Sequence, residues 1–170
     1  MTADPVVLAA TAERVPDTDW SAASVKSLQF VGGEAYTASL RYRGAKVADI
    51  ENDGRGGTPI VHWKRGNAAA DHRAVWAEWV SAYNELNKDD EWFEPEYFAI
   101  VALIDEYEIA KQLRRDSKRF IPVLVKGANL RRDGQYALIR GQAEDPRMIE
   151  AIRAKGEVDR YWDGENWITL

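Results

Sequence analysis

The chain of 170 residues contains no cysteine and only two histidines. Without cysteine it can form no disulfide, no cysteine-ligated zinc site and no thiol nucleophile. His62 and His72 are too few for a histidine-rich metal site, although either could still act as a general base. No serine lies in a Gly-x-Ser-x-Gly motif, which argues against a hydrolase of that kind. The composition therefore favours a non-enzymatic protein without a cofactor over an enzyme.

Long apolar runs and a secretory signal are also lacking. No apolar run approaches the roughly 20 residues that a membrane helix needs. Residues 1–16 have neither the basic start nor the apolar centre of a signal peptide. Hydrophobic residues at 45% and charged residues at 30% are close to the averages for globular proteins. We therefore expect a globular, cytoplasmic protein that has no membrane partner.

Residues 1–24 show no sustained hydrophobic period, and Pro5 and Pro16 interrupt any helix there. We predict that this segment is a flexible tail. The rest of the chain, residues 25–170, has the length of a single domain with a core of its own.

Apolar and polar side chains alternate in the first part of this domain, most cleanly over residues 35–43. Such alternation predicts a half-buried antiparallel strand, and the neighbouring segments extend it to a meander of three or four strands. Arg43 and Gly44 offer a two-residue turn, which would pair Leu40 with Val47. That register would also place like charges opposite each other, so a longer loop or a bulge remains open.

Two helices are predicted to follow the meander. Asn67 is a suitable N-cap for a helix over residues 68–86, whose apolar side chains recur every three or four positions. A second helix is predicted from Pro95 to about residue 118, with acids in its first turn and cations in its last.

The C-terminal part reads as a β-hairpin, a short helix that begins after Asp145, and a final hairpin over residues 158–170. A four-residue loop in the final hairpin would place Trp162 opposite Trp167. The predicted fold class is therefore α+β, with an N-terminal antiparallel β-meander, two packed helices, and a C-terminal β-hairpin, short helix and β-hairpin.

A glycine-rich run lies between two predicted strands and gives two hypotheses. One is a structural loop, because glycine permits positive φ and an Asn-Asp pair favours turns. The other is an anion nest, in which free backbone N–H groups and an arginine bind a phosphate-type or nucleotide-type ligand. The candidate ligand-binding residues are Asn52, Asp53, Gly54, Arg55, Gly56 and Gly57. Neither common nucleotide-binding fingerprint is present.

Charge is distributed unevenly along the chain, although the net charge is only −5. Residues 71–108 contain eleven acids and two lysines or arginines, whereas residues 111–140 contain nine lysines or arginines and two acids. Such asymmetry could steer a protein partner, and the basic segment could bind nucleic acid by charge and stacking. The candidate contact residues are Trp92, Arg114, Arg115, Lys118, Arg131 and Arg132.

Asp105 and Glu108 are spaced to share one face of the second predicted helix. Two carboxylates so placed could contribute to a divalent metal site, as in a metal-dependent nuclease. No third ligand has a diagnostic spacing, and acidic helices commonly bind nothing.

The run over residues 52–57, together with the aromatic-rich strand before it, resembles an uncharacterised family of small bacterial and bacteriophage proteins. The resemblance implies no activity, but it implies a phage or mobile-element context. Residues 160–167, Arg-Tyr-Trp-Asp-Gly-Glu-Asn-Trp, look like a short actinobacterial tryptophan-hairpin domain, which implies a hairpin and no function.

From these patterns we expect a non-enzymatic cytoplasmic interaction protein, a phage or mobile-element accessory that binds and modulates a host or defence protein. Ligand binding at the glycine-rich run and nucleic-acid binding or a metal-dependent nuclease are the alternatives.

Overall fold

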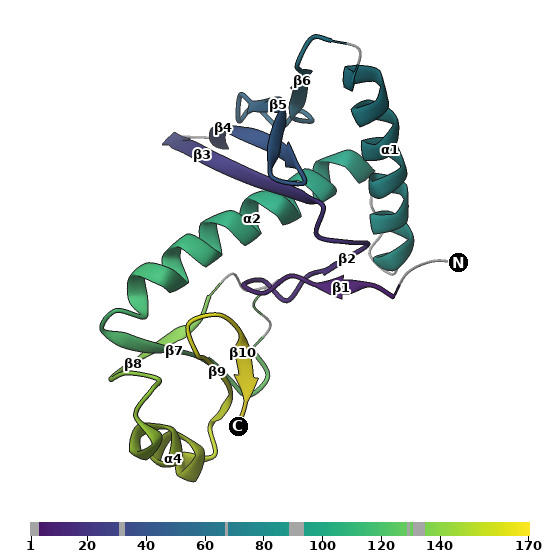
Figure 1. Cartoon of the computed structure of the whole chain (residues 1–170). Helices are drawn as coiled ribbons and strands as arrows, with labels where there is room; N and C mark the ends of the chain where they lie inside the picture. Colours follow the sequence, from purple (N-terminus) through teal and green to yellow (C-terminus); the bar gives the residue numbers. More distant parts are fainter. Residues whose placement is uncertain (1–3, 31–32, 67, 89–93, 129, 131–134) are drawn as a thin grey trace. The chain divides into compact units, whose positions relative to one another are not determined.

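The computed structural model describes residues 4–30, 33–66, 68–88, 94–128, 130 and 135–170 (Figure 1). Helices and antiparallel sheets together confirm the α+β class. Contacts divide the chain into two compact units. The first unit comprises Met1–Leu8 and Arg14–Tyr107, and the second comprises Ala9–Glu13 and Glu108–Leu170. Each unit is described separately below.

The sheet of the first unit is the predicted meander. It contains the strands β3 (Trp20–Phe30), β4 (Gly33–Tyr42), β5 (Ala45–Asn52) and β6 (Ile60–Trp63), paired in chain order. The β4–β5 turn is the predicted two-residue turn, with positive φ at both Arg43 (49°) and Gly44 (80°). A bulge then shifts the register, so that Leu40 pairs with Ala48. This bulge is one of the two solutions that the sequence left open.

The N-terminal segment is not a tail in this structure. It forms a small antiparallel hairpin of β1 (Val6–Val7) and β2 (Arg14–Val15), and β3 already begins at Trp20. Leu8, Val15 and Trp20 are buried in the first unit. The sequence pattern missed this because two-residue strands are too short to show a period.

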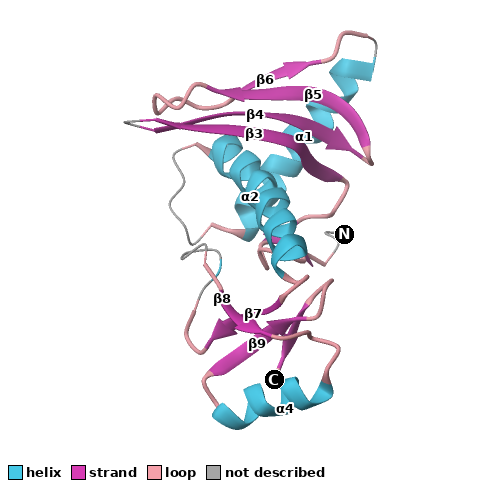
Figure 2. Ribbon diagram, turned by 90° about the vertical axis from the view of Figure 1, so that its left-hand side faces the viewer, coloured by secondary structure: helices cyan, strands magenta, loops and turns pink. Residues whose placement is uncertain are grey.

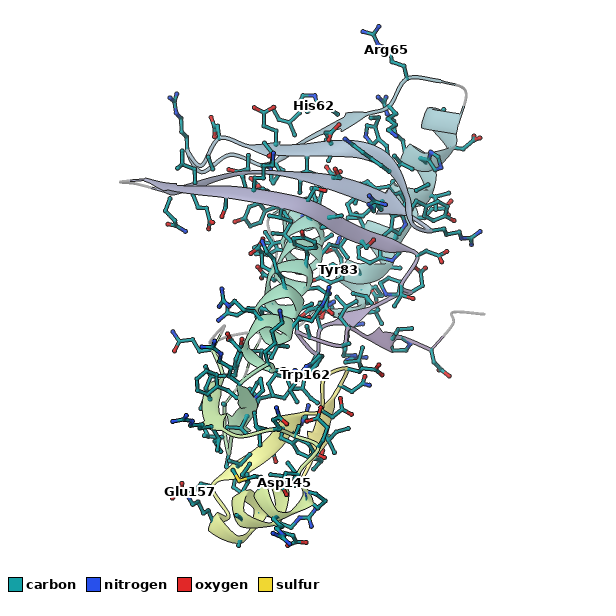
Figure 3. The ribbon with its side chains drawn as sticks, turned by 60° about the vertical axis from the view of Figure 1, so that its left-hand side comes forward. His62, Arg65, Tyr83, Asp145, Glu157 and Trp162 are labelled. Atoms are coloured by element: carbon teal, nitrogen blue, oxygen red, sulfur yellow. The ribbon has the colours of Figure 1, made fainter. Side chains whose placement is uncertain are left out.

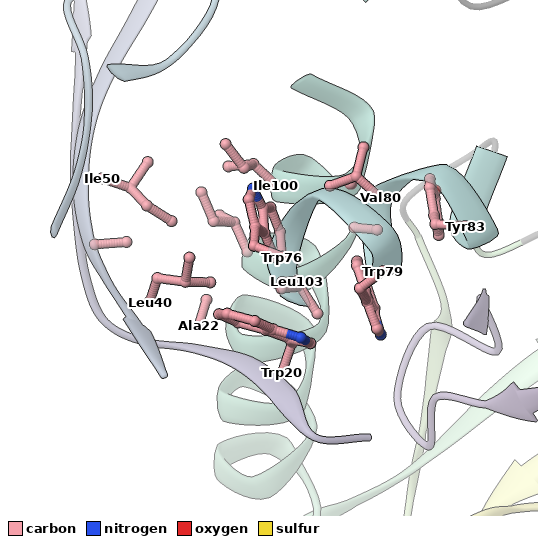
Figure 4. Packing of buried hydrophobic residues seen from close by; sticks show 14 of the residues in the cluster. Trp20, Ala22, Leu40, Ile50, Trp76, Trp79, Val80, Tyr83, Ile100 and Leu103 are labelled. Atoms are coloured by element: carbon pink, nitrogen blue, oxygen red, sulfur yellow. The ribbon is translucent and has the colours of Figure 1, made fainter. Parts of the chain in front are cut away.

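Two helices cover one face of this sheet (Figure 2). The helix α1 (Ala68–Leu86) has the predicted bounds, and α2 (Pro95–Asp116) ends two residues before the predicted end. Figure 4 shows aromatic rings at the centre of the shared core, where Trp20 contacts Trp76 with ring centroids 4.9 Å apart. The two predicted helices thus pack on the meander through a common apolar face. No helix in the described ranges has the length and apolar character to cross a membrane.

The second unit contains the predicted C-terminal hairpins in one four-stranded sheet. Its strands are β7 (Phe120–Val125), β8 (Ala137–Arg140), β9 (Val158–Trp162) and β10 (Trp167–Thr169), in the order β10-β9-β7-β8. The helix α4 (Pro146–Lys155) is capped by Asp145, whose carboxylate accepts the N–H of Arg147 at 2.9 Å. Trp162 pairs with Trp167, which confirms the predicted register of the final hairpin.

The sheet of the second unit is apolar on both faces. Ile121, Val123 and Ile152 form the core on the α4 side. Leu113 and Trp162 form the core on the other side, where Trp167 Nε1 donates to the backbone oxygen of Ala10 at 2.8 Å. A segment from the start of the chain is therefore part of the second unit.

Candidate binding surface

The sheet of the first unit has one covered face and one uncovered face. Ile50 pairs with Val61, and both pack into the core beneath the helices. The next pair along the strands, Glu51 and Ile60, must point the opposite way because side chains alternate across a strand. Figure 2 shows α1 and α2 on the same side of the sheet. The opposite side, here called the outer face, carries no element of the described first unit.

Two large aliphatic side chains are exposed on this outer face. Leu28 on β3 is 69% exposed and Ile60 on β6 is 59% exposed, the two highest values among the large hydrophobic residues of the described chain. The row through Ile60 continues across the sheet, because Glu51 pairs with Thr37 and Thr37 pairs with Lys26. Leu28 lies two residues beyond Lys26 on the same face of β3. The two strands are three strand spacings apart, about 14 Å. An apolar pair at such a separation suits contact with one partner surface.

The glycine-rich run forms a loop at the same end of the sheet, and three of its backbone groups are hydrogen-bonded within the loop. Asn52 Oδ1 accepts the N–H of Gly54 at 2.6 Å, and Asp53 Oδ1 accepts the N–H of Arg55 at 3.0 Å. Asn52 Nδ2 also donates to the carbonyl oxygen of Gly57 at 3.2 Å. Two N–H groups that an anion nest would offer to a ligand are therefore already donated within the loop.

This loop packs against the outer face at the start of β4. A Cβ atom at Gly33 would collide with the carbonyl oxygen of Gly54 and would lie 3.1 Å from its carbonyl carbon. Gly33 and Thr37 lie an even number of residues apart on β4, so they share the outer face. A Cβ atom added to Gly33 would therefore point to the outer face. The hydroxyl of Thr58 fixes the other end of the loop by donating to Glu94 Oε2 at 2.6 Å. We call Lys26, Leu28, Thr37, Glu51, Ile60 and residues 53–57 the distal patch.

The charged residues of the outer face include one exposed ion pair and one exposed contact between a histidine and a carboxylate. Lys46 Nζ lies 2.6 Å from Asp49 Oδ1, and His62 Nε2 lies 3.3 Å from Glu51 Oε2. Figure 3 shows His62 on the side of the sheet away from the helices. Pairs this exposed contribute little stability, typically about 0–1 kcal/mol. Arg55 is exposed, and none of the described acids pairs with its side chain. Its guanidinium can therefore bind an external group without first breaking an ion pair.

Tyr36 lies beneath the distal patch, on the covered face opposite Asn52. Burial, together with the nearby Tyr97 and Asp105, raises the pKa of Tyr36 to about 12. The phenol is therefore neutral at physiological pH, so it does not supply a base.

The remaining predicted site residues are distributed over both units. Asp105 and Glu108 lie one turn apart on α2, and no group of three metal-ligating side chains is present among the described residues. Arg114, Arg115 and Lys118 are exposed in the second unit. Trp92, Arg131 and Arg132 lie outside the described residues.

The exposed residues Leu28 and Ile60 were not recognised in the sequence. Each lies in a strand-like segment with apolar residues at both odd and even positions, so the sequence alone does not show which of them point outward. Comparisons of the chain with protein family models, curated proteins and solved structures give no match. The two resemblances drawn from the sequence therefore stay predictions.

Proposed function

We propose that the chain is a non-catalytic interaction protein that binds a protein partner through the distal patch. The observation that carries the proposal is the exposure of Leu28 and Ile60 on an uncovered sheet face. Burying both in an interface would contribute about 2–4 kcal/mol from the hydrophobic effect, before the cost of association. They would act as the apolar anchors of the contact.

The surroundings of these anchors define the chemistry of the partner. Lys26 and Arg55 supply cations at the rim, and Glu51 supplies an anion that lies beside His62. A matching surface has an apolar centre and an acidic group that faces Arg55, because a bidentate arginine–carboxylate contact adds orientation as well as attraction. Hydrogen bonds within the loop hold the backbone of Arg55, which lowers the entropy cost of ordering the loop on binding.

We propose further that this partner is a cytoplasmic host or defence protein, which a phage or mobile-element accessory would modulate. This part of the proposal depends only on the resemblance of the run at residues 52–57. Two of the alternatives have less support in the geometry. The N–H groups of Gly54 and Arg55 already donate within the loop, which argues against ligand binding there. Asp105 and Glu108 lack a third described ligand, which argues against a metal-dependent nuclease.

Affinity capture with paired variants tests the proposal. The tagged wild-type chain, the variant Leu28→Ser with Ile60→Ser, and a control variant are each incubated with lysate of the natural host, and captured proteins are quantified by mass spectrometry. The control, Val7→Ser with Val125→Ser, removes two other exposed aliphatics (57% and 45% exposed) outside the patch. Circular dichroism verifies that all three chains are folded.

The proposal predicts a stoichiometric protein that the wild type and the control retain and that the patch variant loses by at least tenfold. The single variant Arg55→Ala should retain less of this protein than the wild type does, and its thermal stability should be unchanged. Equal capture by all three chains, or no stoichiometric protein with the wild type, would contradict it.

A further inference from the structure

A cluster of basic side chains in the second unit is not used by the proposed function. Arg114 and Arg115 lie in the last turn of α2, and Lys118 and Arg119 lie in the short turn that leads into β7. Arg140 is the last residue of β8. All five side chains are on exposed residues, and we call them the basic cluster.

Backbone bonds hold the segments of this cluster together. The N–H of Arg119 donates to the carbonyl oxygen of Asp116 at 3.1 Å, so the turn folds back on the end of α2. Arg140 is paired with Phe120 across the β7–β8 ladder, and the N–H of Gly141 donates to the carbonyl oxygen of Arg119 at 3.4 Å. The cations of the helix end, the turn and β8 are therefore brought to one edge of the unit.

Little negative charge compensates them. Asp116 is the one described acid in ion-pair contact with the cluster, at 3.2 Å from Arg115 Nε, and its side chain is only 14% exposed. The same carboxylate accepts the hydroxyl of Tyr136 at 2.9 Å, a bond that adds to burial in raising the pKa of Tyr136. Arg114, Lys118, Arg119 and Arg140 have no ion pair with any described acid.

Helix stability explains only part of the cluster. Cations in the last turn of a helix offset its dipole, which accounts for Arg114 and Arg115. It does not account for Arg119 beyond the helix or for Arg140 on a strand. The second unit has 13 lysines and arginines against 11 acids, whereas the first unit has 10 against 17. The second unit thus has a net charge of +2 and the first unit one of −7, so the basic cluster belongs to the less acidic unit.

We propose that the basic cluster binds the phosphate backbone of nucleic acid. Four of its five cations are arginines, whose planar fork matches phosphate oxygens in two-bond contacts. A membrane surface would attract lysine and arginine alike and needs no such fork. Contacts to phosphates position a nucleic acid but read no base edges, so the binding is largely independent of sequence.

Fluorescence anisotropy of the full chain tests this surface. The probes are a labelled 20-nucleotide oligo(dT) and a labelled 20-base-pair duplex, each titrated at 50, 100 and 200 mM NaCl. The cluster variant carries Arg114→Gln, Lys118→Gln and Arg119→Gln. A matched control carries Arg147→Gln, Arg153→Gln and Lys155→Gln on α4, so both variants lose three positive charges from the same unit.

The expected result is binding by the wild type that weakens steeply with salt. At 50 mM NaCl the cluster variant should bind at least tenfold more weakly than the wild type. The slope of log affinity against log salt concentration on the duplex should become smaller in magnitude by about 2–3, since each lost phosphate contact removes about 0.9. The control should stay within about threefold of the wild type. If the cluster variant does not fold, the single variant Lys118→Gln should still lower the slope by about 0.9.

Three results would overturn the inference. They are no binding by the wild type at micromolar concentrations in 50 mM NaCl, equal losses in the cluster and control variants, and binding to vesicles containing phosphatidylserine without binding to either oligonucleotide. None of these results bears on the distal patch, because that surface is tested by protein capture.

Discussion

Replacing Gly33 with alanine tests whether the glycine-rich loop is a support for the outer face. The added Cβ would overlap the carbonyl oxygen of Gly54 and lie 3.1 Å from its carbonyl carbon. The obstacle is backbone, so the loop must move by about 1 Å or more for the new atom to reach ordinary contact distance. Overpacking of this kind costs about 1–3 kcal/mol.

One effect acts in the opposite direction. Alanine loses less conformational entropy than glycine when it is fixed in a strand, which returns about 0.5–1 kcal/mol. The net expectation for Gly33→Ala is therefore a loss of about 0–2.5 kcal/mol in the free energy of unfolding. The matched control is Gly57→Ala, where a new Cβ would meet nothing within 4 Å and φ is not positive. That change should be neutral or stabilise by less than about 1 kcal/mol.

The assay is urea unfolding followed by far-ultraviolet circular dichroism, with amide hydrogen exchange to locate the change. In Gly33→Ala, protection should fall at the N–H groups of Gly54 and Arg55, which bond to Asn52 and Asp53. Equal stability of the two variants, with unchanged protection in the loop, would refute the close approach of Gly33 to Gly54.

Three further predictions concern the rest of the chain. Trp20→Ala should lower the free energy of unfolding in urea by about 3–5 kcal/mol, because Trp20 is 2% exposed at the centre of the core of the first unit. A loss below about 1 kcal/mol would contradict the burial of this N-terminal segment and favour the predicted tail. Asn87→Ala should cost about 1–3 kcal/mol, because Asn87 Nδ2 donates to the carbonyl oxygens of Tyr83 (2.9 Å) and Arg14 (3.2 Å). The Tyr36 pKa of about 12 exceeds its ordinary value of 10.0, so folded chains keep a proton that unfolded chains release, and stability should fall as the pH rises from 10 through 12. Tyr36→Phe should reduce that alkaline fall in the urea midpoint.

The elements with a long hydrophobic period were predictable from the sequence. The bounds of α1 and the pairing of Trp162 with Trp167 follow from period and turn chemistry, because in each case local pattern and tertiary burial agree. The N-terminal hairpin was not predictable, since its two-residue strands gain their stability from burying Leu8 and Val15 and not from local propensity. The division into two units could not be predicted from a linker in the sequence, because the boundary lies within α2 at residues 107 and 108.

The candidate surface was predictable only in part. The sequence identified the run at residues 52–57, and an Asn-Asp pair followed by glycines was enough to expect turns there. It could not show that the loop meets Gly33, because that contact joins segments about 20 residues apart. It also could not distinguish the outward Leu28 and Ile60 from core residues, since exposure depends on which face the helices cover.

Site-specific photocrosslinking tests the central claim most directly. A photoreactive benzoylphenylalanine is placed at position 28, at position 60 or, as a control, at the exposed position 125 of the second unit, and the chain is irradiated in its natural host. The account predicts the same protein crosslinked from positions 28 and 60 and not from position 125. A protein crosslinked from position 125 alone, or no specific crosslink from positions 28 and 60, would contradict the assignment of the distal patch as the binding surface.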